Sequence, residues 1–160
     1  MIDLVKFTGE QFPLGFHDVV QWNSVAAYEP RTEDELERLV LRRGASVIFR
    51  AEYLATADDL HYRRGGWSEA LLRKAHERKI AVGFSFCDWT RLHDRFERAR
   101  VFGRMQYNVR LCRKFKVHMV VASCARTRWE MRGAEDLLSF ARVLGMTGRE
   151  AREAVSFSMG

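Results

Sequence analysis

Two apolar segments, Ile80-Ala81-Val82-Gly83-Phe84-Ser85-Phe86 and Val117-His118-Met119-Val120-Val121-Ala122-Ser123, decide the fold class of this chain. Each is a nearly continuous apolar run of strand length, which is typical of strands buried on both faces of a parallel sheet. Between them, from about residue 94 to 115, apolar side chains from Phe96 to Cys112 recur at intervals of three or four, which predicts an amphipathic helix with these side chains toward the core. The order strand, helix, strand therefore predicts a parallel sheet covered by helices.

The same alternation extends in both directions from this unit. Further helices are predicted at about 68–78, 134–144 and 148–155, and one begins at Thr32, whose capping box with Glu35 precedes an apolar stripe. Strands are predicted at 1–5, within 18–28 and at 45–49. A complete eight-unit barrel needs about 250 residues, and the 160 residues here have room for five or six strands. We therefore expect a single α/β domain over 1–160, an abbreviated or open TIM-like (β/α) barrel with mostly parallel strands.

The composition predicts a soluble, cytoplasmic protein. The apolar run at the start is too short for a signal peptide, and no stretch has the length of a membrane span. The three cysteines are isolated from one another, without a CxxC pair, and lie in apolar context. They are expected to be buried, reduced thiols.

Positive charge is concentrated in one segment of the chain. The net charge is +6, yet residues 91–132 alone carry twelve lysines and arginines against three acidic residues. Such a focused basic region suits a polyanion, because Lys and Arg supply the phosphate contacts that position nucleic acid. The candidate RNA-binding residues in this segment are Arg100, Arg104, Lys114, Arg126, Arg128 and Arg132. Trp129 lies among them, and we interpret it as a core or loop-anchoring residue rather than a base-stacking one.

Catalytic motifs are harder to find. The opening residues resemble those of the polymerase-and-histidinol-phosphatase family, but Val5 and Phe7 stand where its two metal-binding histidines would be. We interpret four aspartates as solvated or capping residues, namely Asp3, Asp88, Asp94 and Asp136. We therefore expect no metal site and no catalytic residue in this chain.

The chain resembles ribonuclease P protein component 3 over roughly residues 32–158. The resemblance rests on Ile80–Ser85, on the basic helix that ends at Arg113-Lys114-Phe115, on Met119–Ala125, and above all on Trp129-Glu130-Met131-Arg132 followed by Asp136-Leu137. Ala134-Glu135 departs from the usual Pro-Arg, Glu69 replaces a frequent histidine, and the N-terminal third is short for the family.

The resemblance implies an abbreviated barrel of the polymerase-and-histidinol-phosphatase type that pairs with protein component 2. It also implies binding to the ribonuclease P RNA, which with Mg²⁺ removes the 5′ leader of precursor tRNA. The holoenzyme is then the endoribonuclease, and the chain alone is non-catalytic and binds no cofactor. Family positions that carry basic residues fall on Arg38, Arg63, Arg78, Lys114 and Arg152. Asp136 matches a family aspartate, interpreted as a helix N-terminal cap that organises nearby arginines. The alternatives are a metal-dependent phosphoesterase and a generic RNA-binding module.

Overall fold

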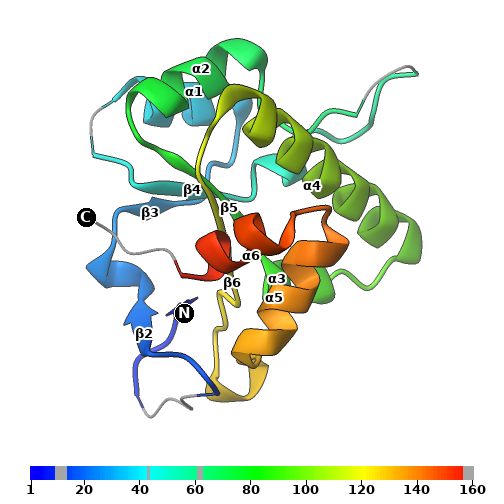
Figure 1. The fold of residues 1–160 in the computed structure, drawn as a ribbon. Coiled ribbons are helices and arrows are strands. Elements are labelled where there is room, and N and C mark those ends of the chain that lie inside the picture. Colours follow the sequence, from blue (N-terminus) through cyan, green and yellow to red (C-terminus); the bar gives the residue numbers. More distant parts are fainter. Residues whose placement is uncertain (10–13, 43, 61–62, 157–160) are drawn as a thin grey trace.

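The computed structural model describes residues 1–9, 14–42, 44–60 and 63–156. Its central feature is a four-stranded sheet in the order β3-β4-β5-β6, beside which β1 and β2 form a two-stranded sheet, and every strand pair is parallel (Figure 1). The strands are β1 (Ile2–Val5), β2 (Asp18–Gln21), β3 (Ala27–Tyr28), β4 (Val47–Phe49), β5 (Ala81–Ser85) and β6 (Met119–Ala122). The predicted parallel α/β fold is confirmed.

The two sheets abut where β1 lies alongside the segment that follows β6. The backbone N–H of Cys124 donates to the carbonyl of Leu4 at 2.9 Å, and that of Lys6 donates to the carbonyl of Ala125 at 2.7 Å. Apolar side chains from both sheets consequently share one enclosed cluster. Among the described residues the pairing does not close into a ring, because β2 and β3 each pair with one strand.

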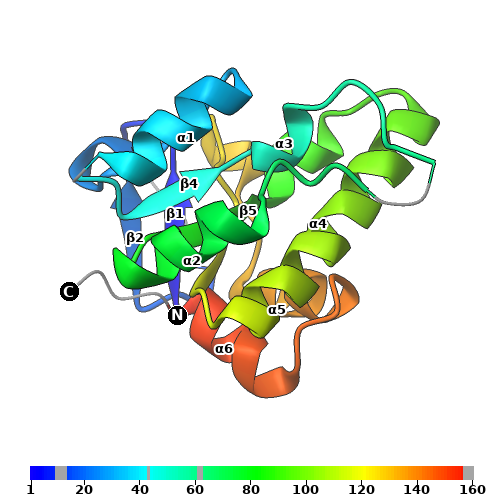
Figure 2. The same ribbon diagram turned by 90° about the horizontal axis from the view of Figure 1, so that it is seen from above.

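Helices cover the outer side of the strands (Figure 2). They bury the larger apolar cluster, which joins β4, β5 and β6 to the apolar stripes of the helices. The long helices are α1 (Glu33–Leu41), α2 (Glu69–Glu77), α4 (Arg95–Phe115), α5 (Ala134–Val143) and α6 (Gly148–Val155). The predicted cap of the first is confirmed, since the Thr32 hydroxyl accepts the N–H of Glu35 at 3.1 Å.

Two features of this region differ from the predictions. A short helix, α3 (Phe86–Thr90), begins directly after β5, where the sequence indicated continued strand and loop. The Ser85 hydroxyl caps α3 by accepting the N–H of Asp88. Phe96, predicted to face the core, is 70% exposed and lies 4.8 Å from the Arg95 guanidinium. The buried stripe of α4 begins later, because the first turn of the helix lies beyond the edge of the sheet.

The remaining expectations concern the thiols and the membrane. The three cysteines are free and buried, as predicted. Burial raises the pKa of Cys87 and of Cys112 to about 12, so neither is a reactive thiolate at neutral pH. Within the part of the chain that the structure describes, no helix has the length and apolar character of a membrane span.

Candidate nucleic-acid interface

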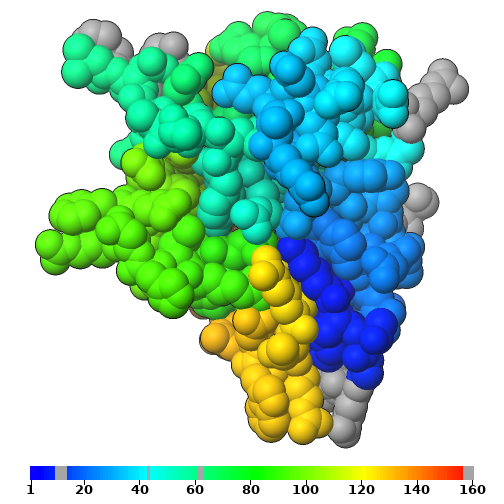
Figure 3. Space-filling view, turned by 180° about the vertical axis from the view of Figure 1, so that it is seen from behind, coloured from blue at the N-terminus to red at the C-terminus, as the bar shows by residue number. Residues whose placement is uncertain are grey.

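The carboxyl ends of the strands form one face of the molecule. Because the strands are parallel, the segments that follow β1, β4, β5 and β6 all emerge at the same edge. Figure 3 shows this face, with the N-terminal segment in deep blue beside the yellow segment after β6 and the green segment after β5. In open α/β sheets this edge is where ligands bind.

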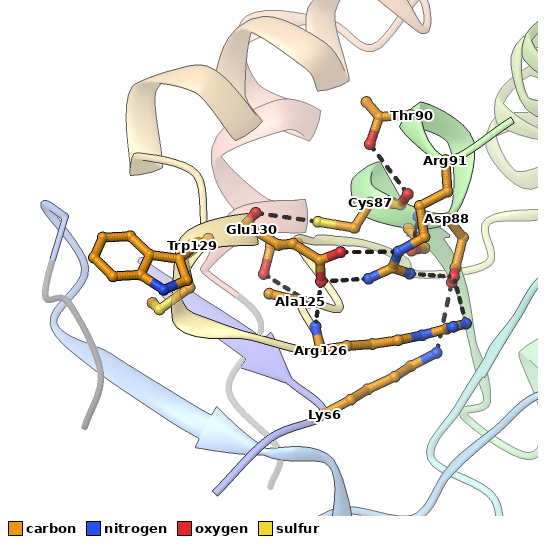
Figure 4. A network of polar contacts seen from close by, with 12 residues as sticks. Lys6, Cys87, Asp88, Thr90, Arg91, Ala125, Arg126, Trp129 and Glu130 are labelled. Carbon is orange, nitrogen blue, oxygen red and sulfur yellow. Dashed lines mark hydrogen bonds and ion pairs between the residues drawn. The ribbon is translucent and has the colours of Figure 1, made fainter. Parts of the chain in front are cut away.

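Asp88 lies at the centre of this face, with 2% of its side chain exposed. Its Oδ1 accepts hydrogen bonds from Arg91 Nη1 at 2.9 Å and from Arg126 Nη2 at 3.4 Å (Figure 4). It also accepts one from Arg50 Nη1 at 3.4 Å. Its Oδ2 lies 3.5 Å from the ammonium of Lys6. Four cations from four segments of the chain therefore surround one carboxylate, and we call these five residues the Asp88 cluster.

Two further carboxylates border the Asp88 cluster. Glu130 accepts from Arg91 Nε at 3.0 Å and from the backbone N–H of Arg126 at 2.7 Å, so it fixes the loop after β6 against α3. Glu29, which follows β3, pairs with Lys6. These contacts occupy Arg91 and Lys6 on a second side, while Asp88 is the acidic partner of Arg50 and Arg126 among the described residues.

The electrostatics of the cluster keep Asp88 ionised. Burial alone would raise its pKa, but Lys6, the hydrogen bond with Ser85 and the nearby arginines hold the pKa below the usual value. Glu52, fully buried after β4, has the opposite behaviour, since burial raises its pKa to about 8 and leaves it uncharged at neutral pH. Counted by formal charge, the four cations exceed Asp88 and its two bordering carboxylates, Glu29 and Glu130, by one. Such an arrangement attracts an anion.

The loop after β6 carries three of the predicted RNA-binding arginines. Arg126 belongs to the Asp88 cluster, and the Arg128 guanidinium lies 4.6 Å from the ring of Trp129. Arg132 donates to the carbonyls of Glu130 and Met131 and thus supports the loop. Trp129 is 72% exposed, so its interpretation as a core residue is wrong. The ring presents a flat surface of the kind on which an unpaired base stacks.

The predicted residues on α4 do not form one surface. Arg104 is 1% exposed, with Nε 2.6 Å from Asp58 Oδ1 and Nη1 bound to the carbonyls of Glu52 and Ala55. Its predicted role in RNA binding is therefore wrong, and it is a structural residue that ties the 52–58 segment to the helix. Arg100 is half-buried, whereas Lys114 is exposed and pairs with Glu69 at 2.6 Å. A helix of 21 residues extends about 30 Å, so Lys114 lies at the opposite end from the Asp88 cluster.

The residues carried over from the family resemblance are dispersed as well. Arg38 and Arg78 lie at α1 and at the end of α2, where Arg78 donates to the carbonyl of Leu41. Arg63 is exposed and lies against Gly103 of α4, and Arg152 is exposed on α6. Of the two expectations for Asp136, the cap is confirmed, since its carboxylate accepts the N–H of Gly133 at 3.1 Å.

Sequence reasoning missed most of the Asp88 cluster, in particular Lys6, Arg50 and Arg91. It also assigned Asp88 a solvated or capping role, which is wrong because its carboxylate is buried among cations. A usable signal was present, since Lys6, Arg50 and Arg126 each come within a few residues after a buried strand. Charged residues in that position of parallel strands gather at the ligand-binding edge.

The fold and this site define a class, a parallel α/β protein whose sheet carries a cationic cluster at its carboxyl edge. In the described residues, no group of three or more His, Cys, Asp or Glu side chains is arranged to hold a metal ion. The model of the family described as RNase P subunit p30 matches residues 55–159, and the chain belongs to this family.

Individual relatives agree with this assignment. The chain is 35% identical over 92 residues to ribonuclease P protein component 3 of Thermococcus gammatolerans, covering 58% of this chain and 42% of the relative. It is 32% identical over 129 residues to that of Methanosarcina acetivorans, covering 77% and 53%. The chain thus spans about half the length of the curated relatives it matches.

A solved structure shares the fold. A chain in the cryo-EM structure of archaeal ribonuclease P with mature tRNA superposes with a TM-score of 0.66 at 20% identity, over 80% of this chain and 52% of that chain.

Proposed function

We propose that this chain is a protein subunit of ribonuclease P that binds the ribonuclease P RNA and supports removal of the 5′ leader from precursor tRNA. The observation that carries the proposal is the family match over residues 55–159. That range contains Asp88 and two of the four cations around it, Arg91 and Arg126. The catalyst in this proposal is the RNA with its Mg²⁺, and the protein holds no cofactor of its own.

The protein contributes charge and shape. Phosphate groups of a folded RNA repel one another, and a cationic surface lowers that repulsion and releases bound counterions. The carboxyl edge supplies such a surface together with the exposed ring of Trp129. We further propose an open barrel of the polymerase-and-histidinol-phosphatase type for the whole fold, protein component 2 as the protein partner, and the cytoplasm as the location.

Reconstitution tests the proposal. The purified chain is combined with the cognate ribonuclease P RNA and the other protein components, including component 2, at limiting Mg²⁺. Omitting this chain alone is expected to lower the rate of precursor tRNA cleavage, and rising salt is expected to weaken its RNA binding steeply. An unchanged cleavage rate on omission would contradict the proposal. RNA binding without any effect on cleavage would favour a generic RNA-binding module instead.

A further inference from the structure

Arg50 and Arg126 approach one point from two strands that are not neighbours. They follow β4 and β6, and Asp88 follows β5, the strand between them. Arg50 Nη1 and Arg126 Nη2 each lie 3.4 Å from Asp88 Oδ1. The two nitrogens are therefore at most 6.8 Å apart, twice that distance. Two oxygens of one phosphate group, each accepting an N–H bond about 2.9 Å long, span such a gap.

Both guanidinium groups retain unused donor capacity. A hydrogen bond of 3.4 Å is weak, and each guanidinium carries five N–H donors in a planar fork. Arg91 differs, because it binds Glu130 through Nε at 3.0 Å as well as Asp88 at 2.9 Å. The side chains of Arg50 and Arg126 are also 32% and 54% exposed, so their remaining donors face solvent.

The backbone at Arg50 supports a functional placement. Arg50 has φ +67° and ψ +15°, the left-handed conformation that costs a residue with a Cβ about 1 kcal/mol or more. Its guanidinium lies 4.8 Å from the ring of Tyr53, which holds the fork in one orientation. Cys124, two residues before Arg126, is also left-handed, with φ +50°. Left-handed residues within two positions of the ends of β4 and β6 thus flank the same cluster.

We propose that Arg50 and Arg126 form a clamp for one backbone phosphate of RNA, with the buried Asp88 carboxylate as the positioning residue. This inference rests on the proposed function for its choice of RNA as the ligand. The formal charge around the site agrees with it. Lys6, Arg50, Arg91 and Arg126 exceed Asp88 and the bordering Glu29 and Glu130 by one positive charge, which matches the single negative charge of a phosphodiester.

Salt-dependent binding of the full chain to the cognate ribonuclease P RNA tests the clamp. The variants are Arg50→Gln, Arg126→Gln and the double variant, with Arg149→Gln as the matched control, since Arg149 is an exposed arginine of α6 away from this edge. Loss of one phosphate contact is expected to lower the slope of log K against log salt by about 0.7 to 0.9 and the affinity by about tenfold. Circular dichroism confirms that each variant is folded.

The two arginines are expected to act as a unit. If they hold one phosphate, the double variant loses less affinity than the product of the single losses. If the affinity losses of the two single variants multiply in the double variant, and the slope of log K against log salt changes by about two, Arg50 and Arg126 contact two separate phosphates. That result would overturn the clamp. Variants that bind with the slope of wild type and of Arg149→Gln would overturn it as well.

Inorganic phosphate is the second probe. Added at constant ionic strength, it is expected to leave RNA affinity unchanged, because the clamp takes a phosphate only as part of a chain with other contacts. Displacement of RNA from wild type but not from the double variant would also support the clamp, because phosphate would then compete with RNA at Arg50 and Arg126. Equal displacement from both would place the phosphate-sensitive contact elsewhere and overturn the proposal. Reconstituted cleavage with wild-type protein is measured in parallel. If wild-type protein stimulates cleavage but the variants keep the wild-type salt slope of RNA binding, only the clamp is rejected. If wild-type protein does not stimulate cleavage, the proposed function is rejected.

Discussion

The two ends of the strands use the same kinds of residues in different ways. At the amino end, Arg113 and Lys114 each pair with one carboxylate, Arg113 with Glu150 at 2.8 Å and Lys114 with Glu69 at 2.6 Å. At the carboxyl end, four cations share Asp88. Local charge in the sequence does not distinguish these two arrangements. The arrangement of the partners does, because at the carboxyl end several cations share one buried carboxylate.

The largest expected effect is loss of the shared carboxylate. Asp88→Asn keeps the shape of the side chain but leaves the partly buried cations without their common counter-charge, so we expect a loss of about 4 kcal/mol in the free energy of unfolding. Urea denaturation measures it. The amino-end counterpart, Glu150→Gln, breaks a one-to-one pair near the surface and is expected to cost about 1 kcal/mol. Equal losses in the two variants would contradict the contrast between the two ends.

Arg104 tests whether a basic residue on α4 contributes to the stability of the fold or to RNA binding. Arg104→Met keeps most of the volume but removes the bonds to Asp58 and to the carbonyls of Glu52 and Ala55. We expect a loss of about 3 kcal/mol in stability, measured by thermal and urea unfolding. Below its unfolding transition, the salt slope of RNA binding should stay at the wild-type value. A lower slope in a fully folded variant would restore Arg104 as a phosphate contact.

Glu52 provides a pH-dependent test. Burial raises its pKa from 4.5 to about 8, so the folded state binds more protons than the unfolded state between these values. Stability therefore falls as pH rises through this window. Glu52→Gln removes that loss, and at pH 7 the variant is expected to be more stable than wild type by roughly 2 to 3 kcal/mol, with little difference near pH 4.5. Unfolding curves recorded from pH 4.5 to 8 measure it, and a gap that does not widen with pH would contradict the assignment.

The smallest effect is expected at the amino end. Lys114 is exposed and paired with Glu69, so Lys114→Gln should change RNA affinity by less than about twofold. Fluorescence anisotropy at several salt concentrations measures it. A change as large as that of Arg126→Gln would show that the amino end also binds RNA, and would remove the distinction between the two ends.

Much of the fold could be predicted from the sequence, because the strands and long helices have strong local patterns. The apolar runs of β5 and β6 and the capping box at Thr32 are signals that neighbouring residues determine. Phe96 and Arg104 were assigned wrongly for a shared reason. Their environments depend on which element packs on each face of α4, and the segment that buries Arg104 lies some fifty residues earlier in the chain.

The site was harder to predict than the fold. Arg126 was identified from the density of basic residues after β6, but the Asp88 cluster combines Lys6, Arg50 and Asp88 from three separate strand ends. Each of these residues is unremarkable in its own sequence context. Only the strand order, with β1 beside the end of β6 and β5 between β4 and β6, brings them together.

The most direct test of the account compares one double variant from each end in reconstituted ribonuclease P. Arg50→Gln/Arg126→Gln alters the carboxyl end, and Lys114→Gln/Arg149→Gln removes the same charge from the amino end. At limiting Mg²⁺, kcat/KM for precursor tRNA is expected to fall about tenfold in the first and to stay within about twofold of wild type in the second. Equal losses, or a larger loss from the amino-end variant, would contradict the claim that the carboxyl edge is the RNA-binding face.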